Sequence, residues 1–581
     1  MKDFLKMLAA VIVGTALVIF VAGVLLIGVV TSLASMGLGT RTTPTSVAQH
    51  TVLVMGFENG IATQDSDKPL TGYAPDFLKI TKGGTGLLSL VRAIEFAATD
   101  PAITMIYLRP QYLNAQITHI EEIRNALQVF RQSGKPIICY ADTYTQAAYY
   151  LATVADKVIL NPLGNMQLQG LSLDVLYYKD LFDKVGIQAQ VIRHGSYKSG
   201  GENYVLSQMS PQERSQTADM LQSTWQYVAG QIAAARHLDI PDVEAACARL
   251  LLTPAEAHKG GFVDEIWYKD QLLDYMCNLC DVKNEKQIRS VSLDDYAAIA
   301  SLKTIHRSKN KIALVYATGE IRLGSGQNGI WSEDLSRQLR LYGQDSTIKA
   351  VVLRVDSPGG DPLAAEVIRR DLEQLAHRKP LVVTFGDLAA SGGYWIASPA
   401  RVILTHPQTI AGSIGVYSLF FSGEQALRRT LHVTPENVST HPNSQFPSYF
   451  RALTADQQAR MQQQVDSTYQ YFLEIVSRGR HLTLARTDSL AQGHTWSGIQ
   501  ALELQLADRT GGLTDALAQA ASLANLTDYQ LIEYPQPLSF LQTLLSTGLQ
   551  DALYQSNISE LMNILESRQG LRADVPYRFE L

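Results

Sequence analysis

One serine in the chain has neighbours that suit a nucleophile. Ser391 stands between two alanines and two glycines in the stretch Ala389–Gly393, where an apolar run gives way to a helical segment. Small neighbours would let a substrate carbonyl approach the hydroxyl, and a helix N-terminus would add free N–H groups and a positive dipole end. An ordinary N-cap serine is the structural alternative for such a residue taken alone.

A glycine turn precedes this serine. The stretch DSPGG, Asp356–Gly360, ends another apolar run, and its backbone N–H groups could face a developing oxyanion beside Ser391. A plain tight turn would also explain these glycines. The pair of features together favours catalysis over two separate structural roles.

A serine hydroxyl is a poor nucleophile unless a base accepts its proton. None of the later histidines stands in a recognisable motif, although His406 remains a possible base; the others are His432, His441 and His494. A lysine can also serve, provided that burial or a positive field lowers its pKa from about 10.4. Lys198 lies in the stretch GSYKS, among residues that could orient its amine, whereas a lone lysine is usually solvated.

The chain repeats itself, which links the two candidates. Residues 139–170 resemble residues 383–415, and the similarity extends to both sides of these passages. The chain is therefore expected to divide into an anchor with a linker, a repeat that supplies the lysine, a repeat that supplies the serine, and a helical tail: residues 1–46, 47–300, 301–535 and 536–581.

The two copies differ where the chemistry would take place. Gln146 occupies in the first copy the position of Ser391, and the segment Asn114–Ala115 replaces the turn glycines, so we assign no site there. Conversely, Asn443 falls at the position equivalent to Lys198. Each copy keeps one member of a pair, which predicts that the serine and the lysine act together.

Within each copy, short apolar runs alternate with helical segments. In the second copy the runs are Ala350–Val355, Leu381–Phe385 and Val402–Thr405. Strands that alternate with helices predict an α/β fold of right-handed βαβ units around a mostly parallel sheet.

The N-terminus carries a candidate membrane anchor. The segment Leu8–Val30 contains 23 residues without a charge, and a helix of this length would span about 34 Å, enough for a bilayer. Lys2 and Lys6 precede it and would hold the N-terminus in the cytoplasm of a bacterial inner membrane, with the rest in the periplasm. A cleaved signal peptide is the alternative, since small residues follow the segment.

Composition excludes some classes of function. The net charge is −6, which argues against a general nucleic-acid binder. The pair Cys277 and Cys280 has the spacing of a metal or redox site but lacks a second pair, so no metal is expected.

Taken together, these motifs are similar to those of the signal peptide peptidase A family, also called protease IV, in its long, duplicated form. The resemblance covers nearly the whole chain beyond the anchor. It is carried by four motifs, GSYKS (Gly195–Ser199), DSPGG (Asp356–Gly360), ASGGYWIAS (Ala390–Ser398) and AGSIGV (Ala411–Val416).

The resemblance implies a ClpP/crotonase-like fold in each repeat, a membrane anchor and cleavage of remnant signal peptides by a serine–lysine dyad. Carried over to this chain, Ser391 is the nucleophile and Lys198 the general base. Gly359 or Gly360 would supply one oxyanion donor and Gly392 a second one. No metal or cofactor is implied.

The resemblance also bears on assembly. The contact between Lys198 and Ser391 could lie within one chain or between neighbouring chains. Because relatives with a single repeat must complete the dyad between subunits, we favour a contact between subunits and expect a ring of four duplicated chains. The substrates would be apolar signal peptides, bound as an added strand at a sheet edge beside the site.

Three other functions compete with this interpretation. The first is a crotonase-like acyl-CoA enzyme, which would need neither an anchor nor Ser391. The second is a Ser–His–Asp protease with His406 as its base. The third is a catalytically inert membrane scaffold.

Overall fold

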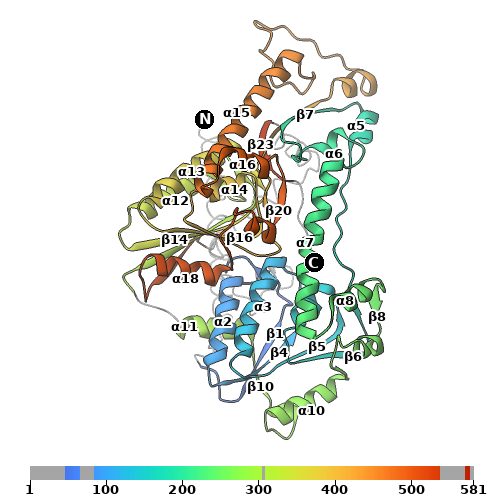
Figure 1. Ribbon diagram of the computed structural model, residues 1–581, viewed down its shortest axis with the longest axis vertical. Coiled ribbons are helices and arrows are strands. Elements are labelled where there is room, and N and C mark those ends of the chain that lie inside the picture. The colour runs from blue at the N-terminus through green and yellow to red at the C-terminus, as the bar shows by residue number, and fades with distance from the viewer. Residues whose placement is uncertain (1–45, 66–83, 304–307, 537–569, 576–581) are drawn as a thin grey trace, which may run out of the picture.

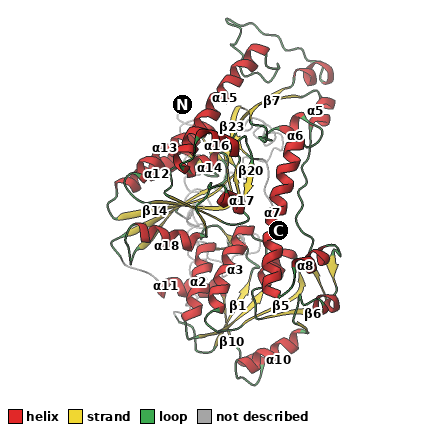
Figure 2. Cartoon of the chain, viewed as in Figure 1, coloured by secondary structure: helices red, strands yellow, loops and turns green. Residues whose placement is uncertain are grey.

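The computed structural model describes residues 46–65, 84–303, 308–536 and 570–575. They form an elongated molecule in which helices flank strands in both halves (Figures 1 and 2). The candidate anchor, Leu8–Val30, and the apolar part of the predicted helical tail, 539–565, lie outside the described residues. Among the helices that are described, none has the length and apolar character needed to cross a bilayer.

The N-terminal half contains a seven-stranded sheet whose central strands run parallel. Its order is β10-β1-β4-β5-β6-β8, with β9 beside β6. The strands are β1 (Thr51–Gly56), β4 (Ile103–Arg109), β5 (Ile137–Tyr144), β6 (Lys157–Gln167), β8 (Leu251–Leu252), β9 (Glu265–Ile266) and β10 (Arg289–Ser292). The helices of this half include α2 (Leu87–Thr99), α3 (Ile117–Arg131), α4 (Gln146–Ala152), α8 (Ile240–Cys247) and α11 (Leu293–Lys303).

The C-terminal half contains an eight-stranded sheet with the same parallel centre. Its order is β20-β18-β16-β14-β11-β22, and β17 and β21 lie off this path. The strands are β11 (Lys311–Thr318), β14 (Ile348–Ser357), β16 (Leu381–Ala390), β17 (Val402–Thr405), β18 (Ile410–Gly412), β20 (Thr495–Ser497), β21 (Arg509–Thr510) and β22 (Gln530–Tyr534). The helices include α12 (Ser332–Gln344), α13 (Pro362–Ala376), α14 (Gly392–Ala397) and α18 (Leu513–Leu523). The predicted α/β class is confirmed.

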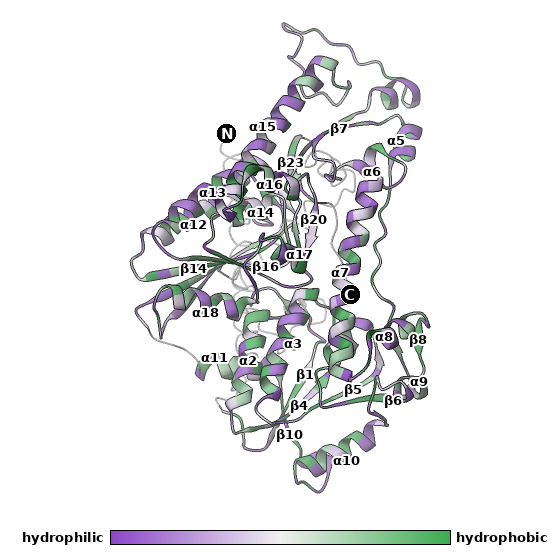
Figure 3. Cartoon of the chain, viewed as in Figure 1, coloured by the Kyte–Doolittle hydropathy of each residue, from purple (hydrophilic) through white to green (hydrophobic). Residues whose placement is uncertain are grey.

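The internal repeat is visible in matching elements. Each half contains a 26-residue helix, α7 (Pro211–Arg236) and α15 (Ala455–Arg480), and each of these ends at a left-handed histidine, His237 and His481. Helix α7 is hydrophilic over its first part and hydrophobic where it packs on the N-terminal half (Figure 3). The C-terminal part of each helix packs in the hydrophobic core of its own half, α7 in the N-terminal half and α15 in the C-terminal half.

A third sheet joins the two halves beside these long helices. Its order is β13-β12-β15-β23-β19-β7. The strands are β13 (Ile330–Trp331), β12 (Ile321–Arg322), β15 (Gly359–Gly360), β23 (Gly570–Asp574), β19 (Val416–Ser422) and β7 (Gln188–His194). Strand β7 comes from the N-terminal half and runs antiparallel to β19 of the C-terminal half over its whole length.

Strand β23 corrects part of the sequence interpretation. Residues 536–581 are expected to be helical, but those described at the end of this range, 570–574, form a strand. The reason is tertiary: β15 and β19 offer main-chain groups on facing edges, and β23 pairs antiparallel with both.

A buried seam holds the halves together. Helix α18 of the C-terminal half packs on α2 of the N-terminal half as well as on β14 and β16. Next to it, Glu122 of α3 forms an ion pair with Arg354 of β14 across the seam, with 2.8 Å between Oε1 and Nη2. Both side chains are buried, so the halves share one interior.

Candidate active site

Ser391 occupies a strained position between β16 and α14. It is the N-cap of α14 with φ 55° and ψ −113°, a left-handed conformation that a non-glycine residue rarely adopts. Its N–H donates to the carbonyl of Gly412 at 2.7 Å, which ties the turn to β18. A strand that turns sharply into a helix holds the hydroxyl at a fixed place above the sheet, as a nucleophile requires.

The structure places Lys198 directly against this serine. The Nζ atom of Lys198 lies 2.9 Å from Oγ of Ser391. It also lies 3.0 Å from Oγ and 3.3 Å from the carbonyl oxygen of Ser413. A neutral amine has two N–H groups for Ser413 and one lone pair for the Ser391 hydroxyl, so the geometry fits a base.

Burial prepares the lysine for this role. Lys198 is 1% exposed, and burial lowers the pKa of its amine to about 7. Two charges of β23 act more weakly and in opposite directions, because Asp574 raises this pKa and Arg572 lowers it. About half of the amine is therefore neutral near pH 7, without any histidine.

The two residues meet within one chain, which corrects the expected contact between subunits. After β7 pairs with β19, the chain continues into a loop whose Tyr197 N–H donates to the carbonyl of Gln492 at 2.9 Å. Gly493 follows, and a Cβ there would lie 2.5 Å from Cβ of Lys198. The N-terminal half thus reaches across to the serine of its own chain, which spacing along the sequence does not reveal.

Ser413 is a site residue that sequence reasoning missed. It has φ 47° and is 1% exposed, and both of its oxygens face Lys198. It lies in the AGSIGV stretch, where nothing in the sequence marks the serine as a partner of the lysine. A buried amine needs fixed hydrogen-bond acceptors, and a search of the sequence for such acceptors could have identified Ser413.

The glycine turn lies beside the serine, as expected. A Cβ on Gly392 would come within 3.2 Å of both Cα of Gly359 and N of Gly360. The N–H of Gly359, however, donates to Oγ of Ser357 at 3.1 Å. Of the two candidates on this turn, Gly360 is therefore favoured as the donor that accompanies Gly392.

We expect Gly359→Ala to lower kcat/KM by about 10²-fold, because a Cβ there would lie 2.8 Å from N of Gly392 and the position has φ 107°. Gly230→Ala in α7 is the matched control, since no atom lies within 4 Å of its Cβ position. The control should keep full activity and gain about 1 kcal/mol in helix stability. Peptide hydrolysis measures the activity of the two variants, and thermal melting measures their stability. Equal activity of the two variants would contradict the assignment of the glycine turn to the oxyanion site.

The histidines that were candidates for the base do not contact Ser391. His406 is buried, with 3.0 Å between its Nε2 and Oε1 of Glu122, so it is part of the seam. His432 and His441 are exposed, and the ring of His494 stacks on Trp496. Among the described histidines, none has a hydrogen bond to Ser391, which disfavours a Ser–His–Asp arrangement.

Gln146, the counterpart of Ser391, makes structural hydrogen bonds to the backbone. Its Oε1 accepts from the N–H groups of Gln169 and Gly170 at 2.9 and 2.8 Å, and its Nε2 donates to the carbonyl of Gly170 at 3.0 Å. In the second copy the equivalent carbonyl oxygen, that of Gly415, lies 3.3 Å from Oγ of Ser391. In the first copy, structural hydrogen bonds therefore occupy the position that Ser391 has in the second copy.

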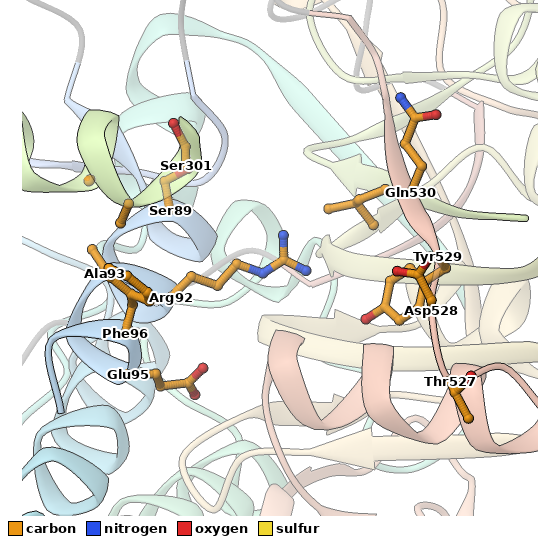
Figure 4. A pocket seen from close by; sticks show the side chains of 13 residues that line it. Ser89, Arg92, Ala93, Glu95, Phe96, Ser301, Thr527, Asp528, Tyr529 and Gln530 are labelled. Atoms are coloured by element: carbon orange, nitrogen blue, oxygen red, sulfur yellow. The ribbon is translucent and has the colours of Figure 1, made fainter. Parts of the chain in front are cut away.

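A separate cavity of about 540 Å³ lies at the seam, between α2, α11 and the strand β22. Arg92 extends from α2 into this gap towards Tyr529 and Gln530, where β22 begins (Figure 4). Its lining shares no residue with the serine–lysine site. This cavity therefore does not contain the candidate catalytic residues.

Comparison with known proteins identifies the family of the chain. A model of peptidase family S49 matches residues 129–283 and 373–527, which together make up more than half of the chain. Protease 4 of Salmonella typhi is 34% identical over 477 residues, which are 79% of this chain and 76% of that protein. Protease 4 of Haemophilus influenzae is 33% identical over 448 residues, 75% of this chain and 72% of that protein.

Among solved structures, the chain is similar to ClpP1 from Listeria monocytogenes, with 16% identity and a TM-score of 0.23 over 35% of this chain and 94% of that chain. The family model covers both repeats, and the protein relatives extend over most of the chain. The chain therefore belongs to peptidase family S49 and is a serine protease.

Proposed function

We propose that the protein is a serine endopeptidase that uses Ser391 as its nucleophile and Lys198 as its general base. The observation that carries the proposal is the 2.9 Å separation between Nζ and Oγ in a buried site. The strained conformation of Ser391 and the adjacent glycine turn support it. A crotonase-like acyl-CoA enzyme would need neither of these two side chains.

The reaction follows from this arrangement. The neutral amine of Lys198 accepts the hydroxyl proton while Oγ of Ser391 attacks the scissile carbonyl carbon. N–H groups of Gly360 and Gly392 stabilise the oxyanion. The ammonium then gives its proton to the departing amine, which leaves an acyl-enzyme. Lys198 next takes a proton from water, the hydroxide attacks the ester, and the proton returns to Oγ.

The substrates that we propose are remnant signal peptides, cleaved in the periplasm by a protein whose segment Leu8–Val30 anchors it in the inner membrane. The length and apolar character of that segment support the anchor. We also propose that each repeat has a ClpP/crotonase-like fold and that four chains form a ring. Analogy with the family supports both statements.

Digestion of a synthetic signal peptide by the detergent-solubilised full-length protein tests the function. Wild type should cut the peptide, and a serine-directed phosphonate should label Ser391. Ser391→Ala should lose both properties while it keeps the thermal midpoint of wild type. An inert scaffold would show neither cleavage nor labelling in the wild type.

A further inference from the structure

A segment of the C-terminal half supports the loop that carries Lys198. This segment, residues 492–495, ends at the first residue of β20, and its Gln492 carbonyl accepts the hydrogen bond from the Tyr197 N–H. A Cβ on Gly493 would come within 2.5 Å of both N and Cβ of Lys198, whereas two carbon atoms in contact are about 3.5–4.0 Å apart. Lys198 can therefore keep its place only beside a residue that has no side chain.

The same segment holds the residue that faces the lysine amine. The N–H of Ser413 donates to the carbonyl of His494 at 2.7 Å, and the N–H of Gly493 donates to the carbonyl of Ile414 at 2.9 Å. Both oxygens of Ser413 lie within hydrogen-bond distance of Nζ of Lys198. One short segment thus contacts the backbone of the lysine and also fixes the acceptor for its amine.

The side chain of Gln216, on α7 of the N-terminal half, links the two loops. Its Nε2 donates to the carbonyl of Tyr197 at 3.0 Å, and its Oε1 accepts from the N–H and the hydroxyl of Thr495 at 3.1 and 3.3 Å. Nε2 also donates to Glu213 of the same helix, so both ends of the amide have partners that fix its orientation. Gln216 is buried, so the loss of its amide would leave polar groups of both loops unpaired.

These contacts bear on the chemistry through the burial of Lys198. The backbone of Tyr197 is held at both of its polar groups, the N–H by Gln492 and the carbonyl by Gln216. Lys198 is the next residue along the chain, and its amine is kept away from water only while this backbone lies against the C-terminal half. A loosened loop would let water reach the amine and would favour its charged form.

We propose that Gln216 and Gly493 are positioning residues, which clamp the lysine loop, residues 195–199, onto the C-terminal half and so hold Lys198 against Ser391. The inference rests on the proposed function for the role of Lys198 as a base. The position of the lysine loop, however, can be measured without catalysis.

The pH profile of activity reports whether Lys198 stays buried. Burial lowers the pKa of His494, so this ring is neutral above pH 7. Uncharged substitutions at Gln216 and Gly493 leave every charge near the lysine in place, so a shift of the profile would come from its burial. The charged and titratable groups beside Lys198 are Asp574 and Arg572 on β23, Tyr417 on β19, Arg193 on β7, Glu213 on α7, and His494.

The first test compares Gln216→Met with Gln226→Met, an exposed position on the same helix. Gln216→Met keeps the shape of the side chain and removes its hydrogen bonds. It should lower kcat/KM at pH 7 about 10-fold and move the half-maximum of the profile from near 7 to above about 8, because the pKa of a loosened Lys198 rises towards its ordinary value. At pH 9.5 its activity should return to within about twofold of wild type. Gln226→Met should change neither quantity.

The second test compares Gly493→Ala with Gly134→Ala. The two glycines have φ 78° and 79°, so alanine strains both backbones alike, but no atom lies within 4 Å of a Cβ on Gly134. Gly493→Ala should lower kcat/KM about 10²-fold, because Cβ of Lys198 has to move by about 1 Å. Gly134→Ala should keep full activity, and equal activity of the two variants would overturn the role of Gly493.

Hydrogen–deuterium exchange of the full-length protein follows the lysine loop directly. Residues 195–199 should exchange faster in Gln216→Met than in wild type or Gln226→Met, because the Tyr197 backbone loses a partner. Unchanged exchange would overturn the inference, and so would a loss of activity that is equal at every pH, since Gln216 would then only support the fold. If exchange increases in Gln216→Met alone and no form of the protein cleaves the peptide, the inference stands and the catalytic proposal fails.

Discussion

Replacing Lys198 by alanine should lower kcat/KM for a signal peptide by at least about 10³-fold at pH 7, because no other base contacts the Ser391 hydroxyl among the described residues. Thermal stability should not fall, since the substitution removes an amine whose burial is costly when it is charged. Lys198→Arg should be equally inactive, because a guanidinium stays protonated. Lys259→Ala, at an exposed position, is the matched control and should keep full activity.

The pH profile of the wild type separates a base from a structural lysine. Activity requires the neutral amine, whose pKa is about 7, so kcat/KM should rise with pH, pass its half-maximum near 7 and level off above it. Burial sets this midpoint, and the charges of Asp574 and Arg572 on β23 adjust it in opposite directions; the ring of Tyr417 lies 6.0 Å from Nζ. A profile that is flat between pH 6 and 9, or substantial activity in Lys198→Ala, would refute the role of Lys198.

The contact between the serine and the lysine could be predicted because the two copies of the repeat can be compared with each other. A side chain that one copy keeps and the other replaces is a candidate for a special role, as Ser391 is beside Gln146 and Lys198 is beside exposed Asn443. The parallel sheets could be predicted as well, since strands that are buried by helices on both faces have continuous apolar sequences.

What the sequence did not predict depends on tertiary pairing. The contact between Lys198 and Ser391 inside one chain follows from the register of β7 on β19, which no local pattern encodes. The strand at 570–574 follows from two facing strand edges far away in the sequence. Ser413 could not be predicted from a local pattern, because a serine that orients an amine has no local signature of its own.

The seam between the halves gives the largest expected effect on stability. Glu122→Ala should destabilise the protein by about 3–5 kcal/mol, because it leaves the guanidinium of Arg354 buried without its counter-ion. The same carboxylate accepts from the N–H of Leu513 at the start of α18, so the attachment of that helix should weaken too. Urea denaturation measures the loss. Asp183→Ala, which breaks an exposed pair with Lys179, should change stability by less than about 1 kcal/mol.

A second substitution and a change of pH identify the ion pair as the cause. Arg354→Met in the Glu122→Ala background removes the uncompensated charge, so it should restore part of the lost stability rather than add to the loss. Burial raises the pKa of the Glu122 carboxyl, but Arg354 and His406 outweigh burial and hold it at about 2. The unfolded value is about 4.3, so the stability that this carboxylate contributes is present above pH 4.3 and is lost as the pH falls towards 2. The difference in stability between wild type and Glu122→Gln should therefore shrink between pH 5 and pH 2. A difference that stays constant over this range would mean that packing, and not charge, holds the two halves together.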